Sequence, residues 1–125
     1  MGARILIIED DPASRELVKY LLESTGHTVL VATEGGSGVR LAIDERPDLI
    51  LCDLQMPVMS GYEATRTLRQ RAAGKAVPII ALTAAALVSE REQALADGMD
   101  DFLTKPIDAE RLVTTLSRWV GVRRV

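Results

Sequence analysis

Residues 49–57, with the sequence LILCDLQMP, constrain the fold of this chain more than any other stretch. Four apolar residues run directly into Asp53, and Pro57 cannot donate the backbone hydrogen bond that a continuing strand would need. A continuous apolar run bounded by such breakers is typical of a parallel strand buried on both faces. We therefore expect Asp53 at the carboxyl end of a central strand, where open parallel sheets keep their ligand sites. An acid there can also be a helix cap or a turn residue, so its role depends on the rest of the chain.

Apolar runs and amphipathic segments alternate along the remainder of the chain. The other strand-like runs are short and rich in aliphatic residues, and they cover residues 5–8, 28–32, 78–82 and part of 99–104. The helix-like segments cover residues 12–25, 35–46 and 62–73, a segment after Thr83 that ends at Gly98, and a last one that follows Asp108.

Five strands that alternate with five helices predict a parallel α/β sheet with right-handed crossovers. The first, third and fourth runs are the most apolar and should be central. We therefore expect a doubly wound, flavodoxin-like fold with strand order 2-1-3-4-5. A chain of 125 residues fits one domain with one core, so we expect residues 1–125 to form a single domain.

The helix ends and helix faces also follow from the sequence. Asp11 is expected to cap the first helix, with Pro12 in its first turn, and Asp108 to cap the last. Glycines weaken the start of the second helix. The residues expected to face the core are Leu17, Val18, Leu21 and Leu22 in the first helix, Tyr62, Ala64 and Leu68 in the third, and Leu112, Val113, Leu116, Trp119 and Val120 in the last.

Composition excludes several classes of partner and site. The net charge is −3 and the basic residues are scattered, which argues against a nucleic-acid partner. No apolar run is long enough for a membrane span. Cys52 is the only cysteine, so we expect no internal disulfide, an inert buried thiol and a cytoplasmic location. His27 is the only histidine, which excludes a site built on several histidines. We expect a monomer or a weak dimer.

Polar residues follow the apolar runs at the points where the predicted strands end. They are Glu9 and Asp10, Asp53, Thr83 and Lys105, and the predicted topology brings all five to one edge of the sheet. Two carboxylates ~4 Å apart repel each other by roughly 4 kcal/mol at an effective dielectric constant of 20. A hard cation such as Mg²⁺ removes that penalty and binds through a few carboxylates.

With a metal bound to the acids, Lys105 and the Thr83 hydroxyl could hold an anion beside it. A metal, a lysine and a hydroxyl around one carboxylate are what phosphoryl transfer onto Asp53 requires, because catalysis of this reaction is positioning and charge neutralisation. Each residue also has an ordinary structural reading. Asp10 and Asp11 can cap a helix, which we favour for Asp11, and Lys105 can be a surface lysine. Only the spacing of these residues taken together specifically indicates a functional site.

Four stretches, residues 7–12, 53–61, 81–84 and 98–106, together resemble the receiver domain of two-component response regulators over essentially the whole chain. The resemblance implies that Asp53 accepts a phosphoryl group from a phosphohistidine on a histidine kinase or phosphotransfer protein. It implies Mg²⁺ bound by Asp10, Asp53 and the main-chain carbonyl of Gln55, with Glu9 in contact through water. Such a domain is a phosphoacceptor that assists its own phosphorylation and dephosphorylation, and is not an enzyme.

The resemblance also implies further roles. Thr83 and Lys105 would contact the phosphoryl oxygens, and the Lys105–Pro106 peptide bond would be cis. Gln55, Ala84 and Ala85 would modulate attack by water. Thr83 and Phe102 would form a switch that reshapes the surface of the fourth helix, fifth strand and fifth helix for a downstream protein.

Two positions depart from the commonest family pattern. Glu9 stands where Asp is also common, and the metal site should survive this change. Phe102 lacks the hydroxyl of the tyrosine often found at the switch position, which removes one possible hydrogen bond from the switched state.

Other readings are weaker. A haloacid-dehalogenase-type phosphatase needs a second Asp two residues after the first, where this chain has Gln55. A flavodoxin-like flavin binder needs a phosphate loop free of acids, but residues 9–11 are all acidic, and a pseudo-receiver would lack part of the cleft. Met1 stands just before the first strand and the chain ends just after the last helix. We therefore expect a stand-alone regulator, with a receiver module of a hybrid histidine kinase as the alternative.

Overall fold

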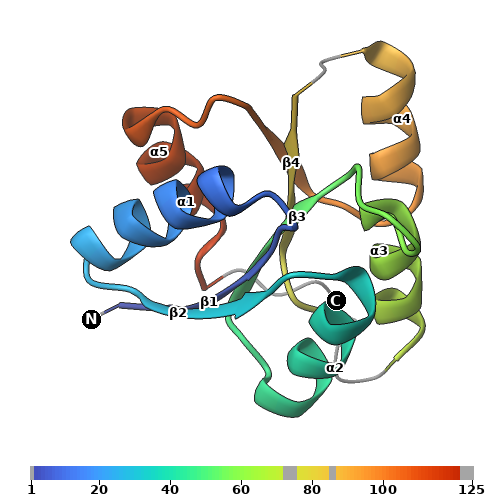
Figure 1. Cartoon of the computed structure of the whole chain (residues 1–125), viewed down its shortest axis with the longest axis horizontal. Helices are drawn as coiled ribbons and strands as arrows, with labels where there is room; N and C mark the ends of the chain where they lie inside the picture. Colours follow the sequence, from blue (N-terminus) through green and yellow to red (C-terminus); the bar gives the residue numbers. More distant parts are fainter. Residues whose placement is uncertain (1, 72–75, 85–86, 122–125) are drawn as a thin grey trace.

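The computed structural model describes residues 2–71, 76–84 and 87–121, and within them a five-stranded parallel sheet lies between two layers of helices (Figure 1). The strand order is β2-β1-β3-β4-β5, as the sequence predicts. In chain order the elements are β1 (Arg4–Ile8), α1 (Pro12–Ser24), β2 (Thr28–Ala32), α2 (Gly35–Glu45), β3 (Leu49–Asp53), α3 (Gly61–Gln70), β4 (Ile79–Thr83), α4 (Val88–Ala96), β5 (Asp101–Thr104) and α5 (Ala109–Trp119). Among the described residues, no helix has the length and apolar character needed to cross a membrane.

The sheet is apolar on both faces because alternate residues of each strand point in opposite directions. In β3, Ile50 and Cys52 pack on the side of α2, α3 and α4, whereas Leu49 and Leu51 pack on the side of α1 and α5. Every residue of β3 and β4 is buried. The prediction of a central strand leading to Asp53 is therefore confirmed.

Side-chain caps fix where three of the helices begin. Asp11 accepts a hydrogen bond from the Ser14 backbone N–H, and Asp108 caps α5 in the same way, both as expected. The hydrogen bonds from Ser14 hold the pKa of the Asp11 carboxyl below its usual value. Ser60 and Glu63 form a reciprocal capping box at the start of α3, which the sequence analysis did not anticipate.

Three residues expected in the core lie instead near the surface: Leu17 is 42% exposed, Val113 45% and Val120 36%. The core-facing residues of α1 are Val18 and Leu22, four positions apart, so Leu17 lies at the flank of the contact with the sheet. The apolar face of α1 is wider than the part of the helix surface that packs against the sheet, so Leu17 remains partly exposed.

Glycines are required where helices approach the strands that carry the site. A Cβ on Gly61 would collide with the Asp53 carbonyl, and the Gly61 N–H donates to the Leu54 carbonyl at 3.0 Å. Gly38 of α2 lies against Ile8 at the end of β1 in the same manner. The glycines that weaken helix propensity here allow close packing behind the two central strands.

Candidate functional site

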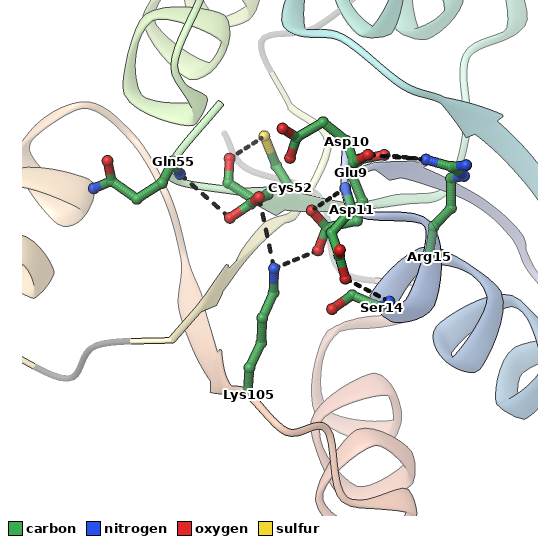
Figure 2. A network of polar contacts seen from close by, with 9 residues as sticks. Glu9, Asp10, Asp11, Ser14, Arg15, Cys52, Gln55 and Lys105 are labelled. Carbon is green, nitrogen blue, oxygen red and sulfur yellow. Dashed lines mark hydrogen bonds and ion pairs between the residues drawn. The ribbon is translucent and has the colours of Figure 1, made fainter. Parts of the chain in front are cut away.

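The carboxyl ends of β1, β3, β4 and β5 bring the predicted residues to one edge of the sheet. Parallel pairing sets Ile8 beside Cys52 and Asp53 beside Leu82, so Glu9 and Asp53 emerge next to each other. Figure 2 shows the acids after β1 and the Lys105 side chain converging on this edge from different elements.

The Lys105 ammonium group lies between two buried carboxylates. Its Nζ is 2.5 Å from Glu9 Oε1 (Figure 2). The same atom is 3.6 Å from Asp53 Oδ2. Glu9 is fully buried and Asp53 is 5% exposed, whereas the Lys105 side chain is 17% exposed. A buried carboxylate needs a partner, and this lysine serves two of them.

Three carboxylates form the acidic part of the cleft. Oxygen atoms of Glu9, Asp10 and Asp53 all lie within 4.8 Å of one another. Such a group of hard oxygen donors, one of which is accessible to solvent, could hold a divalent cation that keeps part of its water shell.

Arg15 has a supporting part that sequence reasoning missed. Its guanidinium donates to the Glu9 carbonyl at 3.1 Å and to the Asp10 carbonyl at 3.3 Å, and the Asp11 N–H donates to Glu9 Oε2 at 3.3 Å. These bonds fix the loop between β1 and α1. A cation in the first turn of a helix is unfavourable for the helix dipole, and that anomaly is a signal that could have pointed to a local acceptor.

The electrostatics of the cleft are unbalanced. The pKa of the Asp53 carboxyl is raised from its usual 3.8 to about 7. Burial is the largest cause, followed by a hydrogen bond with Glu9 and by its negative charge, while Lys105 and the Gln55 N–H oppose the rise. Burial by itself would lower the pKa of Lys105, but its contacts with Glu9 and Asp53 outweigh burial and raise it. Burial and the nearby Glu9 carboxylate thus outweigh the stabilisation that Lys105 gives to ionised Asp53.

The remaining predicted residues surround Asp53. Gln55 donates its backbone N–H to Asp53 Oδ1 at 3.2 Å, and its side chain is exposed. Thr83 is buried at the end of β4, and its carbonyl accepts from the Lys105 N–H at 2.8 Å. The Lys105–Pro106 peptide bond is cis, the geometry that the family resemblance implies. Ala84 is exposed, and Ala85 lies outside the described residues.

Two neighbours of the cleft have contacts of their own. Phe102 pairs in register with Ala81, two positions before Thr83, and is half-buried against the core beneath α2, α3 and α4. Cys52 is buried, and burial together with the charges of Asp53 and Glu9 raises the pKa of its thiol, so it is an inert packing residue as expected.

The structure is thus that of an α/β protein with a doubly wound parallel sheet, whose carboxyl edge holds a lysine and three acids that could bind a cation. A family model described as the response regulator receiver domain matches residues 5–117. The chain belongs to this family of receiver domains. The matched model describes neither a haloacid-dehalogenase-type phosphatase nor a flavin binder.

Relatives place the same domain in two kinds of protein. The chain is 41% identical over 115 residues to protein PilH of Pseudomonas aeruginosa. The matched region covers 92% of this chain and 95% of PilH. The chain is also 43% identical over 123 residues to the sensor protein GacS of Pseudomonas syringae. This match covers 95% of the chain but only 14% of GacS.

A solved structure extends the likeness to three dimensions. The receiver domain of the sensor histidine kinase PA1611 from Pseudomonas aeruginosa has a TM-score of 0.90 and 43% identity, covering 97% of this chain and 99% of that domain. In that structure a magnesium ion is coordinated in the active-site cleft.

The raised pKa of Asp53 predicts a pH-dependent cost to stability in the absence of divalent cations. The folded pKa lies above the unfolded one, so the contribution of Asp53 is fully present below about pH 4 and is lost as pH rises through 7. Asp53→Asn cannot ionise, so its stability advantage over wild type should grow between pH 4 and 7, by about 1–2 kcal/mol after allowing for solvent screening.

Urea unfolding in EDTA at several pH values measures this difference. Asp44→Asn, on the exposed side of α2, is the matched control and should show no such growth. An advantage of Asp53→Asn that is the same at pH 4 and pH 7 would contradict the account.

Proposed function

We propose that this receiver domain takes a phosphoryl group from a histidine kinase or histidine phosphotransfer protein onto a carboxylate oxygen of Asp53. The observation that carries the proposal is the position of Asp53, buried at the end of β3 with Lys105 Nζ at 3.6 Å and the oxygens of Glu9 and Asp10 within 4.8 Å. Glu9, Asp10 and Asp53 are the one group of this kind found among the described residues, and Asp53 is its member at the end of the central strand.

In the proposed reaction the Asp53 oxygen forms a bond to phosphorus as the N–P bond of a phosphohistidine breaks, and the imidazole leaves with the electron pair. Lys105 is placed to move from its carboxylate partners to the phosphoryl oxygens, where a cation stabilises developing negative charge. The Thr83 hydroxyl, at the end of the neighbouring strand, is the second proposed contact.

The donor set fits Mg²⁺. The ligands we propose are Asp10, Asp53 and the main-chain carbonyl of Gln55, with Glu9 acting through water. The clustering of three carboxylates around the single Lys105 ammonium group supports a cation here. The ion would neutralise charge on the transferred group during phosphorylation and during hydrolysis. Gln55, Ala84 and Ala85 are the residues proposed to control access of the hydrolytic water.

We further propose that phosphorylation acts on a downstream protein through α4, β5 and α5. The proposed switch pairs Thr83 with Phe102, which lies on the neighbouring strand two positions lower in register. We take residues 1–125 as one receiver domain in the cytoplasm, acting as a phosphoacceptor and not as an enzyme. We favour a stand-alone regulator of about the length of PilH. A receiver module within a larger kinase such as GacS is the alternative.

Phosphorylation of Asp53 is tested with a small phosphodonor. Wild type incubated with Mg²⁺ and acetyl phosphate should gain the mass of one phosphoryl group, whereas Asp53→Asn should gain none because it lacks the nucleophilic carboxylate. Asp44→Asn should react like wild type. Intact-mass spectrometry is the measurement, and an adduct that persists in Asp53→Asn would overturn the assignment.

The metal site is tested by two adjacent acids with different expected roles. Asp10→Asn should weaken Mg²⁺ binding about tenfold or more, since it removes a charged ligand. Asp11→Asn should change it by about twofold or less, because Asp11 caps α1 through Ser14 and Asn caps equally well. Calorimetry or NMR titration gives both affinities. Equal losses in the two variants would mean that overall charge, and not a ligand at position 10, determines binding.

A further inference from the structure

The Arg91 side chain of α4 covers the face of Phe102. Its guanidinium carbon is 5.2 Å from the centroid of the ring, which is the geometry of a cation–π contact. Arg91 is exposed and Phe102 is half-buried. Phe102 has no hydroxyl, so hydrogen bonding cannot hold this side chain in one orientation. A neighbouring side chain can therefore restrain the ring only through contacts with its faces.

The C-terminal end of α4 is firmly attached to the rest of the molecule. Asp97 pairs with Arg66 at 2.9 Å, and the Gly98 carbonyl accepts from Arg69 Nε at 3.0 Å and from its terminal nitrogen at 2.8 Å. These contacts join the end of α4 to α3.

The N-terminal half of α4 is attached more weakly. The N-cap residue Leu87 makes no side-chain capping bond and is 62% exposed, and Val88 is 70% exposed. On the side facing α3, the Tyr62 hydroxyl and Glu90 Oε1 are buried without a hydrogen-bond partner among the described residues. The Arg91–Phe102 contact is thus a specific tie between this half of the helix and β5.

Phe102 and Arg91 also line a groove of about 460 Å³ between α4, β5 and α5, together with Leu103, Arg111 and Arg118. The ring therefore borders the surface that we propose to change on phosphorylation. If the Phe102 ring rotates away from this groove, its contact with the Arg91 guanidinium is lost.

We propose that Arg91 is a positioning residue that restrains Phe102 in its resting orientation and so sets the balance between the resting and switched states of the domain. The proposal rests on the proposed function, because it concerns the switch that follows phosphorylation of Asp53. Loss of the restraint raises the population of the switched state. By linkage it raises the affinity for any ligand that prefers that state, by up to the same factor.

The test measures the affinity for beryllofluoride, a phosphoryl mimic, in saturating Mg²⁺ by fluorine-19 NMR. Arg91→Ala should bind it about two- to fivefold more tightly than wild type, the range expected from losing an exposed cation–π contact. Arg91→Lys keeps a cation and should stay closer to wild type. Loss of positive charge alone would weaken the binding of an anion, so the expected change has the opposite sign to a general electrostatic effect.

Two further variants isolate the contact with the ring. Arg111→Ala removes an arginine from the same groove and should not raise the affinity, because it loses only positive charge. Arg118 is a poorer control because it pairs with Asp101 at 2.9 Å. In a Phe102→Leu background, Arg91→Ala should have no further effect, since the ring is absent.

Equal affinities of wild type and Arg91→Ala would overturn the inference, as would an effect of Arg91→Ala that persists in the Phe102→Leu background. Both outcomes leave phosphorylation of Asp53 intact. Failure of wild type to bind beryllofluoride would instead overturn the proposed function, and this inference with it.

Discussion

The bridge from Lys105 to Glu9 and Asp53 is the interaction on which the site depends. It joins Lys105 after β5 to Glu9 after β1 and to Asp53 at the end of β3, at distances of 2.5 and 3.6 Å, so it exists only if three strands keep their register. Strands buried on both faces provide that register, because a slip of one residue would exchange the apolar sets that pack on opposite sides of the sheet. The core and the cleft are therefore parts of one arrangement.

One lysine does not neutralise three carboxylates. With Glu9, Asp10 and Asp53 ionised, the cleft has two negative charges in excess of Lys105. Burial is the main cause of the raised pKa of Asp53, and the neighbouring Glu9 carboxylate adds to it. A bound cation would relieve this strain, and the lysine could then serve an arriving anion. The clustered acids thus favour the binding of a metal ion, and the proposed phosphoryl transfer would use the lysine that this binding releases.

The order of the elements could be predicted from sequence because it depends on local patterns, namely apolar runs, breakers and caps. The residues of the cleft could be predicted because strand ends meet at one edge of a parallel sheet. Contacts that depend on how a helix is rotated, such as that of Arg15 with the loop after β1 and of Arg91 with Phe102, could not. The exposure of Leu17 has the same cause, since the sequence gives the apolar sector of a helix but not the width of the strip that the sheet covers.

The most direct measurement is a crystal structure of the domain with Mg²⁺ and beryllofluoride. The account predicts an adduct on Asp53, with Lys105 Nζ within about 3 Å of a fluorine atom, in place of its short contact with Glu9. An adduct on another carboxylate, or a Lys105 that remains on Glu9 and does not contact the adduct, would contradict it.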